Sequence, residues 1–263
     1  MDFATSPFQG EAFLQGRCGV KTYIDSVYLK NVPGKKSYLN RLPAVKYLAE
    51  GGKIDASAPV TIFVGENGTG KSTLLEAVAV AFGFNPEGGS RNFDFSTAET
   101  HSKLYENIIL VRRAFPKDGF FLRAESFYNV ASYINEIDED HTLIARYGGV
   151  SLHEQSHGES FLALIQNRFV GKGLYILDEP EAALSPQSIM ILIAEIKRLI
   201  DADSQFIIAT HSPMIMAFPG ARVYEFSKSG IEEKEYKETE HFQIMKNFLH
   251  DPERMIKIIL DEE

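Results

Sequence analysis

Cysteine, tryptophan and long apolar segments are nearly absent from this sequence. Its 263 residues include one cysteine, Cys18, and no tryptophan. One cysteine cannot form an internal disulfide, which excludes a disulfide-stabilised secreted scaffold, and no second cysteine stands nearby to form a redox pair. The apolar run from Ile189 to Ala194 ends at Glu195, far short of the roughly 20 residues that a membrane-spanning helix needs. The composition therefore favours an ordinary globular protein that folds without disulfides.

The chain also has no excess of basic residues. The chain has 27 lysines and arginines against 36 aspartates and glutamates, which gives a formal net charge of −9. This balance argues against a surface that binds nucleic acid throughout, although it leaves room for a local basic groove. Residues 1–10 carry Asp2 and no positive cluster ahead of an apolar run, so we expect no signal peptide and a cytoplasmic protein.

Short buried strands alternate with helices along most of the chain. Apolar and β-branched runs predict strands, and apolar residues at helical spacing predict helices. The expected strands are 22–31, 60–64, 108–112, 120–123, 174–177, 206–209, 222–226 and 231–236. The expected helices are 70–82, 126–147 with interruptions at acidic turns, 160–169, 188–200 and 241–260, the last with a break at Pro252. This alternation predicts an α/β fold with a largely parallel sheet, and antiparallel pairs near both ends predict a small added β layer.

Two expectations about these elements are more specific. The strands 108–112 and 120–123 are expected to be joined by a turn at 116–119. The helix over 188–200 is apolar nearly all round, so we expect it to pack on two sides.

A glycine-rich segment follows the predicted strand 60–64. Residues 65–72 read GENGTGKS, the phosphate-loop pattern, and a predicted helix follows as the pattern requires. Its glycines let successive backbone N–H groups point inward, and with the helix N-terminus they form an anion site for nucleotide phosphates. Lys71 is expected to reach the β- and γ-phosphates, Ser72 to ligate Mg²⁺, and Thr73 to touch the α-phosphate. The predicted nucleotide contacts of this segment are Gly65, Glu66, Asn67, Gly68, Thr69, Gly70, Lys71, Ser72 and Thr73.

Two adjacent acids end another buried strand. Residues 174–181 read LYILDEPE, so Asp178 and Glu179 stand at the carboxyl edge of the sheet, where nucleotides bind in parallel α/β folds. Asp178 is expected to hold Mg²⁺ together with Ser72. Glu179 is then placed to act as general base toward the attacking water, a role worth roughly 10²–10⁴ in rate. The two motifs together predict a hydrolase that uses ATP and Mg²⁺.

Three further segments indicate which class of P-loop protein this is. They are QSHGES at 155–160, EAALSP at 181–186 and FIIATHSP at 206–213. The first resembles the signature sequence of ABC-type ATPases, usually written LSGGQ, with Ser156 and Gly158 in the matching positions. The second resembles the D-loop of that family. The third places His211 where the family has its switch histidine.

The resemblance covers about residues 58–226 and is greater to the compact, soluble, stand-alone branch of ABC-type P-loop NTPases, near the RecF and SMC relatives, than to transporter subunits. It implies one ABC-type ATPase domain over 1–263. The parts of that domain would be a RecA-like core at about 20–125 and 170–240, a helical signature subdomain at about 126–169, and C-terminal helices at 241–263.

The mechanism that the resemblance implies is cooperative. Ser156 and Gly158, at the start of the signature helix of one subunit, would contact the γ-phosphate held by the loop of the other subunit. His211 would contact the γ-phosphate and hold the attacking water with Glu179, and Lys71 completes the expected catalytic set. ATP would thus join two copies of the chain head to head, and hydrolysis would release them.

The chain departs from the family pattern in two places. His157 replaces the first glycine of the signature. No glutamine occurs between Gln15 and Gln155, so the usual Q-loop glutamine is missing, and Glu125 or Asn129 could stand in as the metal or water contact.

The adenine site is left open by the sequence. Tyr38, Arg41 and Tyr47 lie upstream of the phosphate loop, where a ring or guanidinium could stack on the base, but core or surface roles suit them equally.

Three functions remain open at this stage. The first is a stand-alone mechanochemical ATPase acting with a partner protein or nucleic acid. The second is the nucleotide-binding subunit of a membrane transporter, which the missing glutamine disfavours because that residue links the site to the membrane partner. The third is a binding module that closes on ATP with little hydrolysis, which the presence of Glu179 and His211 disfavours.

Overall fold

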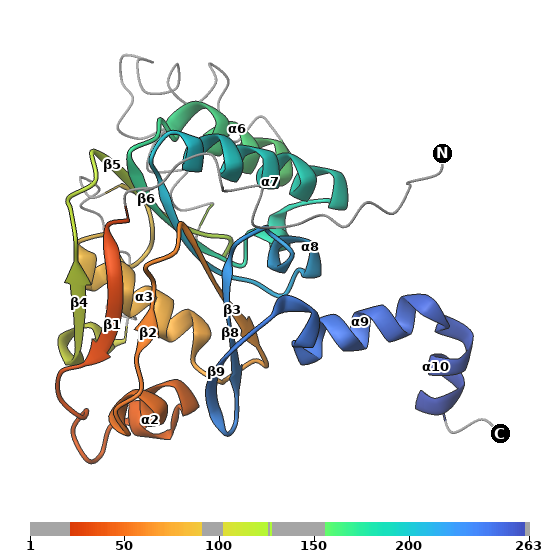
Figure 1. Ribbon diagram of the computed structural model, residues 1–263, viewed down its shortest axis with the longest axis horizontal. Helices are drawn as coiled ribbons and strands as arrows, with labels where there is room; N and C mark the ends of the chain where they lie inside the picture. Colours follow the sequence, from red (N-terminus) through yellow and green to blue (C-terminus); the bar gives the residue numbers. More distant parts are fainter. Residues whose placement is uncertain (1–21, 91–101, 126, 128–155, 261–263) are drawn as a thin grey trace.

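The protein is built around a six-stranded sheet, seen edge-on through the centre of Figure 1. The computed structural model describes residues 22–90, 102–125, 127 and 156–260. The strand order is β5-β6-β7-β3-β8-β9, in which the first five strands are parallel and β9 is antiparallel. The strands are β3 (Val60–Gly65), β5 (Asp118–Arg123), β6 (Gly173–Asp178), β7 (Gln205–Ala209), β8 (Arg222–Ser227) and β9 (Gly230–Lys234). The predicted largely parallel α/β sheet is thereby confirmed.

The central strands are apolar on both faces because both faces are covered. Every residue of β6 and of β7 is buried. Strands of a parallel sheet therefore read as continuous apolar runs instead of alternating ones. This is the pattern from which the strands at 174–177 and 206–209 are predicted.

A second, smaller sheet is antiparallel, with strand order β2-β1-β4. Its strands are β1 (Ile24–Leu29), β2 (Ile54–Asp55) and β4 (Ile108–Arg112). The expected small β layer is confirmed. The strands β4 and β5, which follow each other in the sequence, nevertheless belong to different sheets, because β4 pairs with β1 and β5 pairs with β6.

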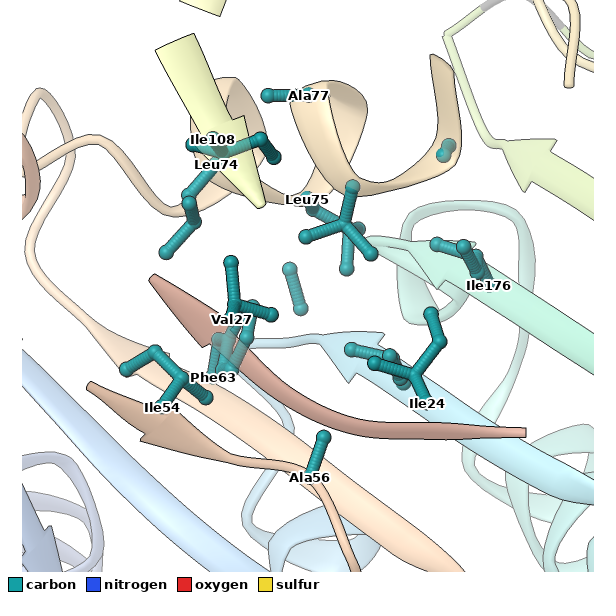
Figure 2. Packing of buried hydrophobic residues seen from close by; sticks show 14 of the residues in the cluster. Ile24, Val27, Ile54, Ala56, Phe63, Leu74, Leu75, Ala77, Ile108 and Ile176 are labelled. Carbon is teal, nitrogen blue, oxygen red and sulfur yellow. The ribbon is translucent and has the colours of Figure 1, made fainter. Parts of the chain in front are cut away.

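Helix α3 (Lys71–Phe82) lies between the two sheets. Eight of its twelve residues are buried, and Leu74 and Leu75 contribute to a core with Phe63 and Ile176 of the large sheet and Ile24 of the small one (Figure 2). Burial of each such side chain stabilises the fold by about 1.5–3 kcal/mol. This core fixes α3, and with it the loop that precedes the helix, against the carboxyl ends of the strands.

Helices α6 (His157–Arg168) and α7 (Pro186–Asp201) cover the opposite face of the large sheet (Figure 1). The expectation that the second of these packs on two sides is wrong. Met190 and Ile191 are 56% and 43% exposed, whereas Leu192, Ile196 and their neighbours on the same face are buried. One face of α7 is enough to cover the sheet, so the apolar residues of the other face remain at the surface.

The remaining helices are short or peripheral. They are α2 (Pro43–Ala49), α8 (Pro213–Met216), α9 (Glu240–His250), α10 (Pro252–Ile259), and the 3-10 helices η1 (Tyr38–Arg41), η2 (Lys103–Asn107), η3 (Pro180–Ala183) and η4 (Tyr236–Glu238). The predicted break at Pro252 is confirmed, and α9 and α10 extend away from the body of the protein (Figure 1). Within the described residues, no helix combines the length and apolarity needed to cross a membrane. Residues 128–155, most of the expected helical subdomain, lie outside the described part of the chain.

Candidate functional site

The segment 65–72 leaves the carboxyl end of β3 and runs directly into α3. Three of its residues, Gly65, Gly68 and Gly70, have positive φ angles of 127°, 78° and 100°. These backbone conformations are costly for residues with a Cβ atom, which is why glycine stands at each position. Gly70 is also the N-cap of α3. The segment therefore ends at a helix N-terminus, where free N–H groups and the helix dipole favour an anion.

Gly65 is the most constrained of the three glycines. A Cβ at this position would lie 2.0 Å from the carbonyl oxygen of Phe226 on β8, whereas a Cβ at Gly68 would meet nothing within 4 Å. We predict that Gly65→Ala lowers the free energy of unfolding by about 2–4 kcal/mol, the sum of backbone strain and steric overlap. Gly68→Ala is the matched control and should cost only about 1–2 kcal/mol of backbone strain. Urea unfolding measures both, and equal losses would contradict the assigned overlap.

Lys71 lies inside the loop. Its Nζ donates hydrogen bonds to the carbonyl oxygens of Gly65 (2.7 Å) and Glu66 (2.9 Å), and the residue is 4% exposed. Burial lowers the pKa of Lys71, and the nearby carboxylates of Glu179 and Asp178 oppose that shift. The loop thus surrounds a cation at the point where the sequence predicts phosphate binding.

Ser72 and Asp178 meet across the sheet edge, as the sequence predicts. The hydroxyl of Ser72 donates a hydrogen bond of 3.0 Å to Oδ1 of Asp178, although the two residues are 106 positions apart in the sequence. Burial raises the pKa of Asp178 to about 6, against the opposing effects of Arg123 and Ser72. A cavity of about 60 Å³ adjoins both residues. A hydroxyl and a carboxylate oxygen are ligands that Mg²⁺ prefers, so the donor set fits the metal.

Glu179 adopts a backbone conformation that is unusual for its residue type. Its φ and ψ are both 50°, in the left-handed region, and its N–H donates to the carbonyl of Ala209 on β7 (2.9 Å). Strained non-glycine residues of this kind cluster at functional sites. This turn brings Oε1 of Glu179 to 3.7 Å from Nε2 of His211. The structure therefore brings the two expected catalytic residues together.

His211 is held by Glu181, which belongs to the segment 181–186 that resembles the D-loop. The carboxylate of Glu181 accepts hydrogen bonds from the backbone N–H of His211 and from the hydroxyl of Thr210 (2.8 Å for the latter). Burial and then the charge of Lys71 lower the pKa of His211, against the effects of Glu179 and Glu181. The imidazole is therefore neutral at pH 7, and only one of its nitrogens carries a proton to donate.

Ser156 begins α6 as its N-cap. Its side chain accepts from the N–H of Glu159 (3.4 Å), and the carboxylate of Glu159 accepts from the N–H of Ser156 (3.0 Å), which completes a capping box. The sequence signal for such a box is a serine followed three residues later by glutamate before an apolar run, and the segment SHGE carries it. Gly158 lies against η3, where a Cβ would be 3.0 Å from the carbonyl of Ala183.

The signature residues and the phosphate loop occupy separate places on this chain. The described residues that line the cavity beside the loop are Leu42, Asn67, Gly68, Gly70, Lys71, Ser72, Thr73 and Glu179, with none from α6. Ser156 is exposed and contacts residues of its own helix.

Of the two residues that could replace the missing glutamine, the structure describes only Glu125. The side chain of Glu125 is 85% exposed and lines the small cavity with Ser72 and Asp178. Asn129 lies outside the described residues. Of the residues that could contact adenine, Tyr38 is exposed and lies in η1 together with Arg41. The next residue after Arg41 is Leu42, which lines the cavity beside the loop.

The fold and this arrangement of residues are those of a P-loop nucleotide-binding domain. A phosphate loop leaves one strand of a largely parallel sheet, an acid pair ends a second strand, and a histidine follows the strand between them. The chain belongs to the AAA domain family, whose model matches residues 44–251. No curated protein matches the sequence.

Several solved structures are similar to this chain. The SMC head domain from Thermotoga maritima is 16% identical over 81% of this chain and 99% of that chain, with a TM-score of 0.44. The structure of cbiO1 from Clostridium perfringens, part of the ABC transporter complex cbiONQ, is 16% identical over 91% and 100% of the two chains, with a TM-score of 0.49. A nucleotide-free ATP-binding cassette from an ABC transporter is 18% identical over 88% and 96%, with a TM-score of 0.47.

Proposed function

We propose that this chain binds ATP with Mg²⁺ and hydrolyses it, and that two copies close head to head on the nucleotide. The observation that carries the proposal is the meeting of Ser72 with Asp178 at 3.0 Å beside a buried lysine and an acid–histidine pair. These groups come from three separate segments of the chain. Their convergence at one sheet edge matches the requirements of phosphoryl transfer, which are phosphate binding, metal ligation and orientation of water.

Each residue of the site has a proposed role that its chemistry suits. The N–H groups of the loop and Lys71 bind the phosphate oxygens, and Ser72 and Asp178 hold Mg²⁺, which neutralises charge on those oxygens. Glu179 accepts a proton from the attacking water. His211 orients that water or the terminal phosphate by a hydrogen bond, and Glu181 holds His211 in place through its backbone.

The position of Ser156 supports the proposed dimer. The start of α6 is exposed, and a helix N-terminus favours an anion. We propose that it meets the terminal phosphate bound by a second copy. Glu159 carries a negative charge in the same first turn, so its carboxylate must turn away from the helix end when the phosphate arrives.

The target of the ATPase is part of the proposal. We propose that the motion is coupled to a partner protein or to nucleic acid in a soluble cytoplasmic setting, in preference to a membrane subunit. ATP turnover measured with and without single- and double-stranded DNA separates the two targets, because only a nucleic-acid partner accelerates turnover in that assay.

Sharing of active sites between copies is the test of the dimer. Alone, Ser156→Arg should abolish ATP turnover, and Glu179→Gln should slow it by roughly 10²–10⁴. We predict that a mixture of the two variants regains turnover, because one composite site of the mixed dimer combines an intact Glu179 with an intact Ser156. Phosphate release at several mixing ratios measures this, and a mixture no more active than the sum of its parts would contradict the shared site.

A control separates the interface from the helix cap. Ser156→Ala removes the cap at a cost of about 1 kcal/mol but adds no bulk. If Ser156→Ala loses turnover as completely as Ser156→Arg, and loses folded protein with it, the effect belongs to the capping box.

A further inference from the structure

Arg123 is a cation beside the aspartate that is proposed to hold the metal. It ends β5, and the parallel register of β5 with β6 places it directly opposite Asp178. Its Nε lies 3.5 Å from Oδ2 of Asp178. The other oxygen of that carboxylate, Oδ1, accepts the hydrogen bond from Ser72. Asp178 is therefore shared between a fixed cation on one side and the serine of the phosphate loop on the other.

A buried carboxylate holds the guanidinium in this position. Nη1 of Arg123 donates to Oε2 of Glu76 on α3 at 2.8 Å, and the Glu76 side chain is only 11% exposed. The second oxygen of Glu76 accepts from the backbone N–H of Ser102 at 2.9 Å. Because Arg has a rigid planar fork, the bond at one end of the guanidinium also restricts where Nε can point.

The end of the guanidinium that faces Asp178 is not satisfied. Nε of Arg123 is buried and forms no hydrogen bond. A buried donor without a partner carries a free-energy cost. The ion pair with Asp178 thus keeps the guanidinium charge near the metal site without forming a hydrogen bond. Such an interaction can change readily when a ligand binds at the site.

Arg123 also balances the charge of the small cavity. Three carboxylates line this cavity, those of Glu125, Asp178 and Glu179, and Arg123 is the one cationic side chain among its described lining residues. Carboxylate oxygens arranged around a small cavity attract divalent cations. The positive charge of Arg123 opposes that attraction directly.

We propose that Arg123 weakens the binding of divalent metal to Asp178 until a nucleotide binds, so that metal binding depends on nucleotide binding. This inference rests on the proposed function, because it assigns a regulation to the same metal site. Without nucleotide, the guanidinium offsets part of the negative charge at Asp178 and repels a divalent cation. A triphosphate brings negative charge and phosphate oxygens, and these outweigh the repulsion and complete the coordination of the metal.

The test measures binding of Mn²⁺ alone, without nucleotide. In Arg123→Gln the carboxylates of the cavity lose their resident cation, so we expect Mn²⁺ to bind about tenfold tighter, or more, than to the unmodified protein. Arg123→Lys keeps the charge and should bind Mn²⁺ as weakly as the unmodified protein. Electron paramagnetic resonance of free Mn²⁺ measures both. No gain in Arg123→Gln, or an equal gain in Arg123→Lys, would overturn the proposal.

Two further variants keep the result interpretable. Arg123→Gln leaves Glu76 buried without its partner, so the double variant Arg123→Gln/Glu76→Gln provides a second protein that does not bury an unpaired charge. It should also gain Mn²⁺ binding. Adding Asp178→Asn to Arg123→Gln should abolish the gain, and persistence of the gain would place the metal elsewhere and refute the role of Asp178. Because no nucleotide is present, failure of this test is separate from failure of ATP binding, which variants of Lys71 report.

Discussion

Lys71→Ala is expected to weaken ATP binding by about a hundredfold or more. Hydrogen bonds from a charged donor are worth about 1.5–3 kcal/mol each, and each 1.4 kcal/mol corresponds to a factor of ten in affinity. Lys71 already lies in the centre of the loop, 2.7 Å from the carbonyl of Gly65 and 2.9 Å from that of Glu66. Its charge is therefore preorganised for phosphate, and no other residue of the loop carries a positive charge.

The measurement is a titration with a fluorescent ATP analogue, supported by thermal unfolding to show that the variant is folded. Lys228→Ala is the matched control, because Lys228 is a lysine paired with Glu66 of the same loop (3.5 Å) but its side chain is 87% exposed. We expect Lys228→Ala to bind nucleotide nearly normally. Unchanged affinity in a folded Lys71→Ala would refute the assignment of the phosphate site.

Glu179→Gln should bind ATP with normal affinity and slow its hydrolysis by roughly 10²–10⁴, the usual contribution of a positioned general base. The amide has the shape of the carboxylate but accepts no proton at neutral pH. Because the nucleotide is then retained, two copies should remain joined across it. Phosphate release measures turnover, and light scattering during size-exclusion chromatography with saturating ATP measures mass. A variant that is inactive but monomeric would remove the main support for the head-to-head dimer.

Glu125→Gln is the control for the base. Glu125 is a carboxylate that lines the same small cavity as Glu179 and Asp178, but its side chain is 85% exposed. We expect it to keep most of its turnover. An equal loss in Glu125→Gln and Glu179→Gln would show that the charge of the cavity matters more than the position of the base.

Much of the fold is predictable because its signals are local. The β-branched run at 60–64 and the glycines that follow it specify a strand, a loop and a helix within some twenty residues. The hairpin of β8 and β9 is predictable from the turn signal around Ser229–Gly230, and Gly230 has a φ of 138°. The C-terminal helix pair follows from Pro252, which cannot continue α9.

Other features depend on pairing between distant segments and could not be predicted in this way. Nothing local shows that β4 pairs with β1 while β5 pairs with β6. The hydrogen bonds of the buried Gln205 side chain also depend on distant segments. Its amide accepts from the N–H of Tyr23 (2.7 Å) and donates to the carbonyl of Ala56 (2.6 Å). These bonds join residues next to the ends of β1 and β2 in the small sheet to β7 of the large one, across 182 and 149 residues of sequence.

By itself, the sequence determined the class of chemistry: a phosphate loop, an acid pair after a buried strand and a histidine after another, each recognisable from adjacent residues. Only the tertiary structure decided which charges become neighbours. It placed Arg123 against Asp178 and tied Glu181 to His211. The physical reason is that strand order and register arise from burial of whole faces and from long-range pairing, whereas a motif requires only the backbone freedom and side chains of consecutive residues.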